Sequence, residues 1–423
     1  MEGCCKVSVI IPVYNVENYL QECLDSVVCQ TLDDYEIICV EDCSTDKSMD
    51  ILKKYATQYP MLRILEYGDN RGQAYARNKG MEIANGKYLY FMDSDDLLVN
   101  KDCLARMYQY AEKEQLDCLL FDAYMEYETE ELREIFVKLY TKGIEGDKYT
   151  ASFDYPDVMN GFDYFTNCYR NGDFRCVVWQ QFWRKDYLKN NNLSFDADTS
   201  PHEDLLFSFK ALLKVERIQY IREPMYIYRF RENSSTSTLI TLKRIKAYVL
   251  CYCYAIDYLQ QYLQNYELDE TLVGFLNDIK TLIKRGAIDL IKRGIDVYEV
   301  KFDNAIYDLQ FRLILTEEWN ALTKLLSCKE YQQLVSCEPI IYGAGYVGSH
   351  VEKMLNAFGI HNYTMAVTDE ANAINIGNSK VVSLAKVDRD ADRVVILAVN
   401  KKYRDEMERY ARTLGFNKII YIA

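Results

Sequence analysis

The sequence lacks the features of a membrane-spanning or exported protein. None of its apolar runs approaches the roughly 20 residues that a membrane helix needs, and the amino terminus has no basic region followed by a long apolar core. None of the 14 cysteines stands in a C-x-x-C pair or has the spacing of zinc ligands. We therefore expect a cytoplasmic protein whose thiols are reduced.

Positive charge is also scarce. The chain has 50 lysines and arginines against 64 aspartates and glutamates, a net charge of −14. Binding to a nucleic-acid backbone needs a basic surface, so this balance argues against nucleic acid as a partner. A single nucleotide can still bind through a metal ion and a few arginines. At 423 residues the chain has room for two or three globular domains.

The most informative stretch is an apolar run that ends in carboxylates. Gly86 precedes residues 88–92, a near-continuous apolar segment typical of a parallel-sheet strand that is covered on both faces. Three acids follow at its carboxyl end, where open α/β sheets bind ligands: Asp93, Asp95 and Asp96. Carboxylates this close repel one another unless a cation offsets their charge, which favours a divalent metal. The alternative is an acidic turn that caps the next helix, the role we assign to Asp96.

Strands and helices alternate around this stretch, which predicts an α/β fold with a parallel sheet. The expected strands are 7–13, 36–40, 62–65, 88–92 and 117–122, and the expected helices are 17–30, 46–58, 72–84 and 102–114. Residues 124–155 show no clear periodicity. From residue 161 the pattern is helical, through the tryptophan-rich segment 177–184 to residue 207, and a strand pair follows at 217–221 and 225–230. Residues 240–335 have no proline and predict helices.

A second α/β pattern begins after Pro339. The strand 340–342 leads into a G-x-G-x-x-G motif and an amphipathic helix, and further strands are expected at 394–399 and 418–422. The motif residues are Gly343, Gly345 and Gly348, with Asp369 21 residues further on at the end of the next strand. This context predicts a small Rossmann-like unit and a second nucleotide site.

Short polar motifs near the ends of the first strands occur in a specific order. In chain order they are Pro12-Val13-Tyr14-Asn15, Glu41-Asp42, Asn70-Arg71-Gly72, Ala76-Arg77-Asn78 and Asp93-Ser94-Asp95. Over about residues 6–230 this order resembles the family 2 glycosyltransferases with the GT-A fold. The resemblance implies a transferase domain at 1–236, a helical connecting region at 237–336 and a Rossmann-like domain at 337–423, like those appended to bacterial polysaccharide transferases.

The resemblance implies a UDP-sugar donor and Mn²⁺ or Mg²⁺. Asp95 would bind the metal directly, and Asp93 the metal or the ribose. Asp42 would accept a hydrogen bond from uracil, and Tyr14 would stack on the base or pack in the core. The other expected donor-site residues are Pro12, Gly72, Ser94, Arg77, Arg229 and Arg231. Arg77 pairs with an acid of the site or with the nucleotide. One of Arg229 and Arg231 clamps the diphosphate, or both are strand-end residues.

Glu203 and Asp204 match the acidic pair of the family's acceptor helix, where the aspartate takes the proton of the acceptor hydroxyl. Without the resemblance they would be first-turn acids of a helix after Pro201. His202 is interpreted as a cap or packing residue. Gln180 and Gln181 stand where many relatives have asparagine and lysine. Trp179 and Trp183 either stack on an acceptor sugar or belong to the core.

We therefore expect an inverting, metal-dependent transferase that moves a sugar to a glycan or lipid-linked acceptor in cell-surface polysaccharide synthesis. One alternative is a sugar nucleotidyltransferase, which should carry a glycine-rich basic loop where this chain has Pro12 to Asn15. Another is a nucleotide-sugar-sensing or scaffold protein with an inactive site. The basic helix 278–294 either touches an anionic membrane surface or presents a solvated face. No pattern predicts an oligomeric state.

Overall fold

In the computed structural model the chain divides into two units, Met1–Val297 and Tyr298–Ala423. The structure describes residues 5–315 except 140–143, 146, 154, 156, 232–239, 263–268, 294 and 296–299. In the second unit it further describes residues 338–343, 348, 351–352, 355, 362–368, 381–388, 393–398 and 401–422. The three-part division expected from the sequence stays a prediction.

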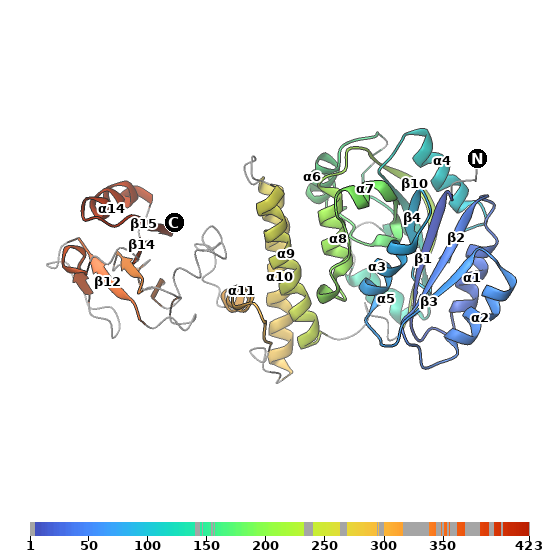
Figure 1. The fold of residues 1–423 in the computed structure, drawn as a ribbon, viewed down its shortest axis with the longest axis horizontal. Coiled ribbons are helices and arrows are strands. Elements are labelled where there is room, and N and C mark those ends of the chain that lie inside the picture. The colour runs from blue at the N-terminus through green and yellow to red at the C-terminus, as the bar shows by residue number, and fades with distance from the viewer. Residues whose placement is uncertain are drawn as a thin grey trace. The chain divides into compact units, whose positions relative to one another are not determined.

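The first unit is built on one mixed β-sheet (Figure 1). Its main path runs β3-β2-β1-β4-β9-β6-β10-β5, and the neighbours among β1 to β4 pair in parallel as expected. Strand β9 lies antiparallel between β4 and β6, whereas β6 and β10 pair in parallel. The strand bounds are β1 Val7–Val13, β2 Tyr35–Glu41, β3 Leu62–Glu66, β4 Tyr88–Phe91, β5 Leu97–Leu98, β6 Cys118–Tyr127, β9 Gln181–Arg184 and β10 Ile218–Phe230.

Helices cover both faces of this sheet, and each face has its own core. Val9 and Ile11 of β1 belong to the core beneath the first set of helices, while Ile10 belongs to the opposite one, as the two-residue period of a strand requires. The first set is α1 Leu20–Val28, α2 Ser48–Gln58 and α4 Cys103–Lys113; the second is α3 Gln73–Ile83, α6 Gly161–Asn171, α7 Lys185–Asn190 and α8 Glu203–Leu212. The predicted α/β class is confirmed.

Two secondary-structure predictions are wrong. Residues 177–184 were expected to be helical, but they form a 3-10 turn, Val178–Gln180, followed by strand β9. Phe182 and Trp183 enter opposite cores of the sheet, which only an extended segment allows. The strand pair expected at 217–230 is one strand, β10, whose pairing with β6 shifts register between Ile221 and Tyr226.

The segment 124–155, for which the sequence predicts no element, adds two short strands beside the interior strand β6. It completes β6 and continues with α5 Glu130–Leu139, β7 Ile144–Glu145 and β8 Lys148–Tyr149. Strand β8 pairs with β6 and β7 in antiparallel fashion. The local sequence carries little hydrophobic periodicity because these strands are only two residues long.

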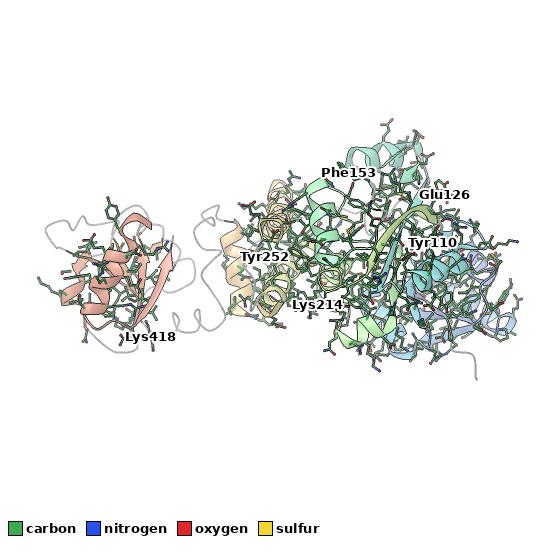
Figure 2. All side chains as sticks on the ribbon, turned by 90° about the horizontal axis from the view of Figure 1, so that it is seen from above. Tyr110, Glu126, Phe153, Lys214, Tyr252 and Lys418 are labelled. Atoms are coloured by element: carbon green, nitrogen blue, oxygen red, sulfur yellow. The ribbon has the colours of Figure 1, made fainter. Side chains whose placement is uncertain are left out.

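Two long helices, α9 Leu242–Tyr262 and α10 Glu270–Lys292, lie side by side (Figure 1). Helix α9 packs on α8 and helix α10 on α6, so both belong to the first unit. Tyr252 of α9, labelled in Figure 2, is buried, and its ring lies 5.4 Å from Nζ of Lys280 on α10. In the described part of the chain, no helix combines the length and the apolarity that crossing a membrane requires.

The second unit contains a five-stranded parallel sheet in the order β13-β12-β11-β14-β15. Its elements are α11 Ala305–Leu315, β11 Ile340–Tyr342, β12 Thr364–Val367, β13 Val381–Ser383, β14 Val394–Ala398, α14 Lys401–Thr413 and β15 Lys418–Ile422. The predicted parallel sheet is confirmed.

The glycine motif after β11 is described in part. Gly343 has a φ of +121°, and a Cβ on Gly348 would lie 1.8 Å from the Gly343 carbonyl oxygen, so the turn needs glycine at both positions. Gly345 and Asp369 lie outside the described residues. A nucleotide at this turn stays a prediction.

The approach of Gly86 to β1 yields a first prediction. The Gly86 N–H donates to Ser8 Oγ at 2.8 Å, and an added Cβ would lie 2.3 Å from the Ser8 backbone nitrogen. We expect Gly86→Ala to lower the free energy of unfolding by about 1–3 kcal/mol, since backbone atoms must move. Gly68→Ala is the control, because its Cβ would meet no atom within 4 Å. Equal denaturation midpoints for the two variants would contradict this packing.

Candidate active site

A cavity of about 330 Å³ lies in the first unit, beside the carboxyl end of β4. Its walls come from α3, the segment after β4, β6, α5, β8, the 3-10 turn before β9, α8, β10, α9 and α10. The lining residues that matter for the chemistry are Arg77, Asp93, Trp179, His202, Asp204, Tyr228, Arg244 and Tyr248. The cavity therefore brings together several of the residues that the sequence predicts for the donor and acceptor sides.

Arg77 holds this site together through three carboxylates. One of its terminal nitrogens, Nη1, donates to Asp204 Oδ1 at 2.7 Å and to Glu203 Oε1 at 3.0 Å, and Nη2 donates to Asp93 Oδ1 at 2.9 Å. The Arg77 side chain is 1% exposed and that of Glu203 is fully buried. Burial alone would lower the pKa of Arg77, but the three carboxylates raise it, so the guanidinium stays charged.

Asp204 reaches the cavity, and the pKa of its carboxyl is raised. Burial raises its pKa to about 7, with further contributions from the charges of Glu203 and Asp93, even though Arg77 acts in the opposite direction. Its side chain keeps 22% exposure, whereas Glu203 beside it has none. A carboxyl that reaches a cavity and titrates near neutral pH is suited to general base catalysis.

Asp95 and Asp96 have different environments. Asp95 pairs with Arg231, with Nη2 and Oδ2 2.8 Å apart, and burial together with the charge of Asp93 raises its pKa. Asp96 is buried and accepts hydrogen bonds from Tyr226 Oη and from the Arg229 N–H, both at 2.7 Å. The helix-cap assignment of Asp96 is wrong, because its carboxylate joins the segment after β4 to β10.

Asp93 and Asp95 are the residues that could hold a divalent cation. Mg²⁺ commonly takes one or two carboxylates together with the phosphates of its substrate, so two aspartates are a sufficient protein contribution. Among the residues that the structure describes, no cluster of three or more acidic, histidine or cysteine side chains is arranged to hold a metal alone. Both aspartates have arginine partners that balance their charge here, Arg77 and Arg231. Their metal role stays a prediction.

Asp42 fixes the start of α3. Its carboxylate accepts hydrogen bonds from the N–H groups of Arg71 and Gly72, both at 2.7 Å, and the residue is 2% exposed. Gly72 has a φ of +83°, which favours glycine at this helix start. Because Gln73 and Arg77 of α3 line the cavity, Asp42 positions one of its walls. Its contact with uracil stays a prediction.

The remaining donor-site candidates lie at strand ends. Tyr14 follows β1 and is 46% exposed, so the alternative that it packs in the core is wrong. Pro12 lies within β1, and Ser94 is buried after β4. None of these three lines the cavity described above. Their contact with a nucleotide stays a prediction.

The two arginines of β10 and the segment after it differ in position. Arg229 forms ion pairs with Glu22 and with Glu126 of β6, and Glu126 is labelled in Figure 2. Nε of Arg229 lies 2.7 Å from Oε2 of Glu126. Arg231 contacts Asp95, and its guanidinium carbon lies 4.9 Å from the ring centroid of Tyr19. Arg231 is therefore the arginine next to the aspartates of the site.

The two tryptophans and His202 are packed residues. Trp183 is fully buried with Tyr187 and Phe207, so its alternative role on an acceptor sugar is wrong. Trp179 lines the cavity and stacks on the rings of Tyr226 and Tyr228, but only 4% of it is exposed.

His202 makes no side-chain capping hydrogen bond at the start of α8. It stacks on Tyr248 with centroids 3.7 Å apart. Burial, together with the charge of Arg244, lowers its pKa to about 3, so the ring is neutral near physiological pH. The packing interpretation of His202 therefore describes its environment, and the cap interpretation is wrong.

Sequence reasoning missed the part of the cavity that α9 supplies. Arg244 and Tyr248 line it from positions four residues apart, which places them on one face of the helix. Their spacing was visible in the sequence, but nothing local connects that face to a site around Asp204. Tyr226, which donates to Asp96, was missed for the same reason.

The first unit is similar to known glycosyltransferases. Residues 8–165 match the family model described as Glycosyl transferase family 2. An uncharacterized glycosyltransferase, EpsJ of Bacillus subtilis, is 33% identical over 230 residues, which cover 54% of this chain and 62% of that protein. The poly(ribitol-phosphate) beta-glucosyltransferase of Bacillus spizizenii is 33% identical over 226 residues, which cover 53% of this chain and 32% of that protein. The chain therefore spans less than two thirds of these relatives.

The chain is also similar to solved structures of glycosyltransferases. TarS 1–349 of S. aureus in complex with UDP-GlcNAc has a TM-score of 0.48 and 22% identity, covering 75% of this chain and 83% of that one. A mannosyltransferase of Pyrobaculum calidifontis in complex with GDP-Man and Mn²⁺ has a TM-score of 0.44 and 16% identity, and the match covers 84% of this chain and 86% of that one.

The class of protein follows from the sheet topology, the carboxylates after β4 and the family match. The first unit has the mixed α/β architecture of the GT-A fold, as the sequence predicted. Within it, the chain carries a family 2 glycosyltransferase domain.

The buried arginine generates a second prediction. Arg77→Ala leaves Glu203 without its counter-charge at a fully buried position, so we expect the free energy of unfolding to fall by about 3–5 kcal/mol. Arg71→Ala is the matched control, since its pair with Asp69 is exposed and such pairs contribute about 0–1 kcal/mol. Urea unfolding followed by circular dichroism measures both. A loss below 1 kcal/mol for Arg77→Ala would show that Glu203 finds another partner.

Proposed function

We propose that the protein transfers a sugar from a UDP-sugar to a hydroxyl group of a glycan or lipid-linked acceptor in the synthesis of a cell-surface polymer. The family 2 domain and the names of the relatives support glycosyl transfer. The observation that carries the proposal is the position of Asp204, which reaches the cavity and shares Arg77 with Asp93. One guanidinium thereby fixes the distance between an acceptor-side carboxylate and a donor-side carboxylate.

Asp204 acts as the general base in this proposal. The acceptor hydroxyl loses its proton to Asp204 as its oxygen forms a bond to the anomeric carbon, while the bond from that carbon to the diphosphate oxygen breaks and UDP leaves. Attack from the side opposite the leaving group inverts the anomeric configuration. Glu203 cannot serve in its place, because it is fully buried and its Oε1 is bonded to Arg77.

The donor diphosphate binds beside Asp93, Asp95 and Arg231. A divalent cation bound there supplies Lewis-acid stabilisation of the charge that develops on the departing diphosphate. Arg231 pairs with Asp95 in this structure, and its planar guanidinium suits phosphate oxygens equally well. Asp42 supports the same site by fixing the start of α3, and we assign Tyr14, which is exposed, to the nucleobase.

The acidity of Asp204 gives a third prediction, on pH dependence. A base works only when deprotonated, and the folded pKa of Asp204 is raised to about 7. We expect kcat/KM to rise as pH increases through about 7 and then to level off. Asp204→Asn should lower the rate roughly 100- to 10,000-fold and remove this dependence. UDP release at acceptor concentrations well below KM, followed from pH 5.5 to 8.5, measures both.

Asp196→Asn is the control for this measurement. Asp196 precedes α8, and its carboxylate pairs with Lys210 of α8 at 2.8 Å and lies outside the cavity. This variant should keep the wild-type rate and pH profile. A flat wild-type profile between pH 6 and 8, or wild-type turnover by Asp204→Asn, would rule out Asp204 as the base.

The metal assignment gives a fourth prediction that does not depend on turnover. If Asp95 is a direct ligand, adding Mn²⁺ should tighten UDP binding to the wild-type protein, and Asp95→Asn should abolish that gain. Calorimetric titration of UDP with and without Mn²⁺ measures the difference. Asp69→Asn, an exposed acid near the start of α3, is the control. UDP binding that is equally tight in a chelator and in Mn²⁺ would refute the assignment.

A further inference from the structure

A second cavity adjoins the candidate active site. It has a volume of about 620 Å³ and lies between α6, α8 and α10. Three residues, Cys176, Leu205 and Leu282, line both cavities. Leu205 directly follows Asp204 in α8, and Leu282 is 39% exposed. The boundary between the cavities is thus one residue away from the candidate base and open to solvent.

Aromatic rings form one side of this second cavity. Phe174 and Phe275 lie edge to face with centroids 5.6 Å apart, and Tyr169 meets Phe275 at 6.3 Å. Phe275 is buried, whereas Tyr169 and Phe174 are partly exposed. The cavity therefore presents ring surfaces that are anchored in the core beneath α8 and α10.

Charged side chains surround these rings. Arg170 at the end of α6 and Glu270 and Asp278 of α10 line the same cavity, and all three are exposed. The Tyr169 hydroxyl donates to Asp278 Oδ2 at 2.6 Å, which fixes the direction of that carboxylate. Hydrogen-bond acceptors and donors are thus placed around an aromatic surface.

This combination suits a sugar ring better than an apolar chain. A sugar has C–H faces that pack on aromatic rings and hydroxyl groups around its edge that bond to carboxylates and guanidinium groups. An isoprenoid chain would cover the charged rim without offering it hydrogen-bond partners, which is costly. The volume lies within the roughly 300–1,000 Å³ of ordinary small-molecule sites.

We propose that the second cavity binds a sugar unit of the acceptor that lies beyond the unit whose hydroxyl is glycosylated. The proposal rests on the function proposed above and deepens it. With its reacting hydroxyl at Asp204, the acceptor passes Leu205 and Leu282 and reaches Asp278. The acceptor is therefore an oligosaccharide or a longer glycan, and a single sugar fills only part of the site.

Glycan binding to the full chain tests this directly. The probes are oligosaccharides of one to six units built from glucose, galactose or N-acetylglucosamine, titrated calorimetrically in the presence of UDP and Mn²⁺. We expect at least one series to bind more tightly as its length increases. Asp278→Ala should weaken the longer members roughly tenfold, the loss of one hydrogen bond to a charged group, and leave the monosaccharide unchanged.

Asp289→Ala is the matched control. Asp289 is another acid of α10, but it pairs with Arg293 and lines neither cavity. Leu282→Trp, which fills the boundary, is a second variant and should raise KM for long acceptors only. Affinity that does not depend on length for any probe, or equal effects of Asp278→Ala and Asp289→Ala, would overturn the proposal. Preferential binding of an isoprenyl phosphate would also overturn it.

A separate measurement distinguishes this failure from a failure of the proposed function. Calorimetric titration of UDP-sugars in the presence of Mn²⁺ requires the donor site but no acceptor. Failure of every UDP-sugar to bind would contradict the transferase proposal, while the glycan titrations would still report on the second cavity. Normal UDP-sugar binding together with length-independent glycan binding would contradict the proposal for the second cavity alone.

Discussion

The burial of one guanidinium group constrains the whole first unit. Arg77 lies 16 residues from Asp93 and 126 and 127 residues from Glu203 and Asp204, yet it bonds to all three. An unpaired buried charge costs several kcal/mol, so α3, the segment after β4 and α8 must meet at this point. The packing of α3 and α8 on the sheet and the geometry of the site therefore depend on the same interaction, and a change that separates these segments affects folding and function together.

The same cluster carries more negative than positive charge. Arg77 offers one positive charge to three carboxylates, and the excess is one cause of the raised pKa of Asp204. Asp95 has Arg231 as its partner, while among the described residues the donors to Asp96 are neutral, the Tyr226 hydroxyl and a backbone N–H. A site with this balance favours a cation beside the donor diphosphate, and a positive charge placed near Asp204 would weaken it as a base.

Local pattern was enough to predict most of the sheet and the positions of the acids, because buried parallel strands are apolar and their ligand-binding ends are polar. It failed where an element depends on distant neighbours. Strand β9 is extended because β4 and β6 flank it, and Asp96 is not a cap because Tyr226, 130 residues away, reaches it. The partners of Arg77 and the contribution of Arg244 likewise follow from packing that no short window of sequence contains.

Helices α9 and α10 lie beyond residues 8–165, which match the family model, and Leu282 of α10 lines both cavities. The Arg77 cluster, by contrast, involves no residue of either helix. Mutations on the exposed face of α10 can therefore accumulate without disturbing the buried charges on which folding depends. For the function proposed above, such a division would let natural selection alter the choice of acceptor while the donor site is inherited unchanged.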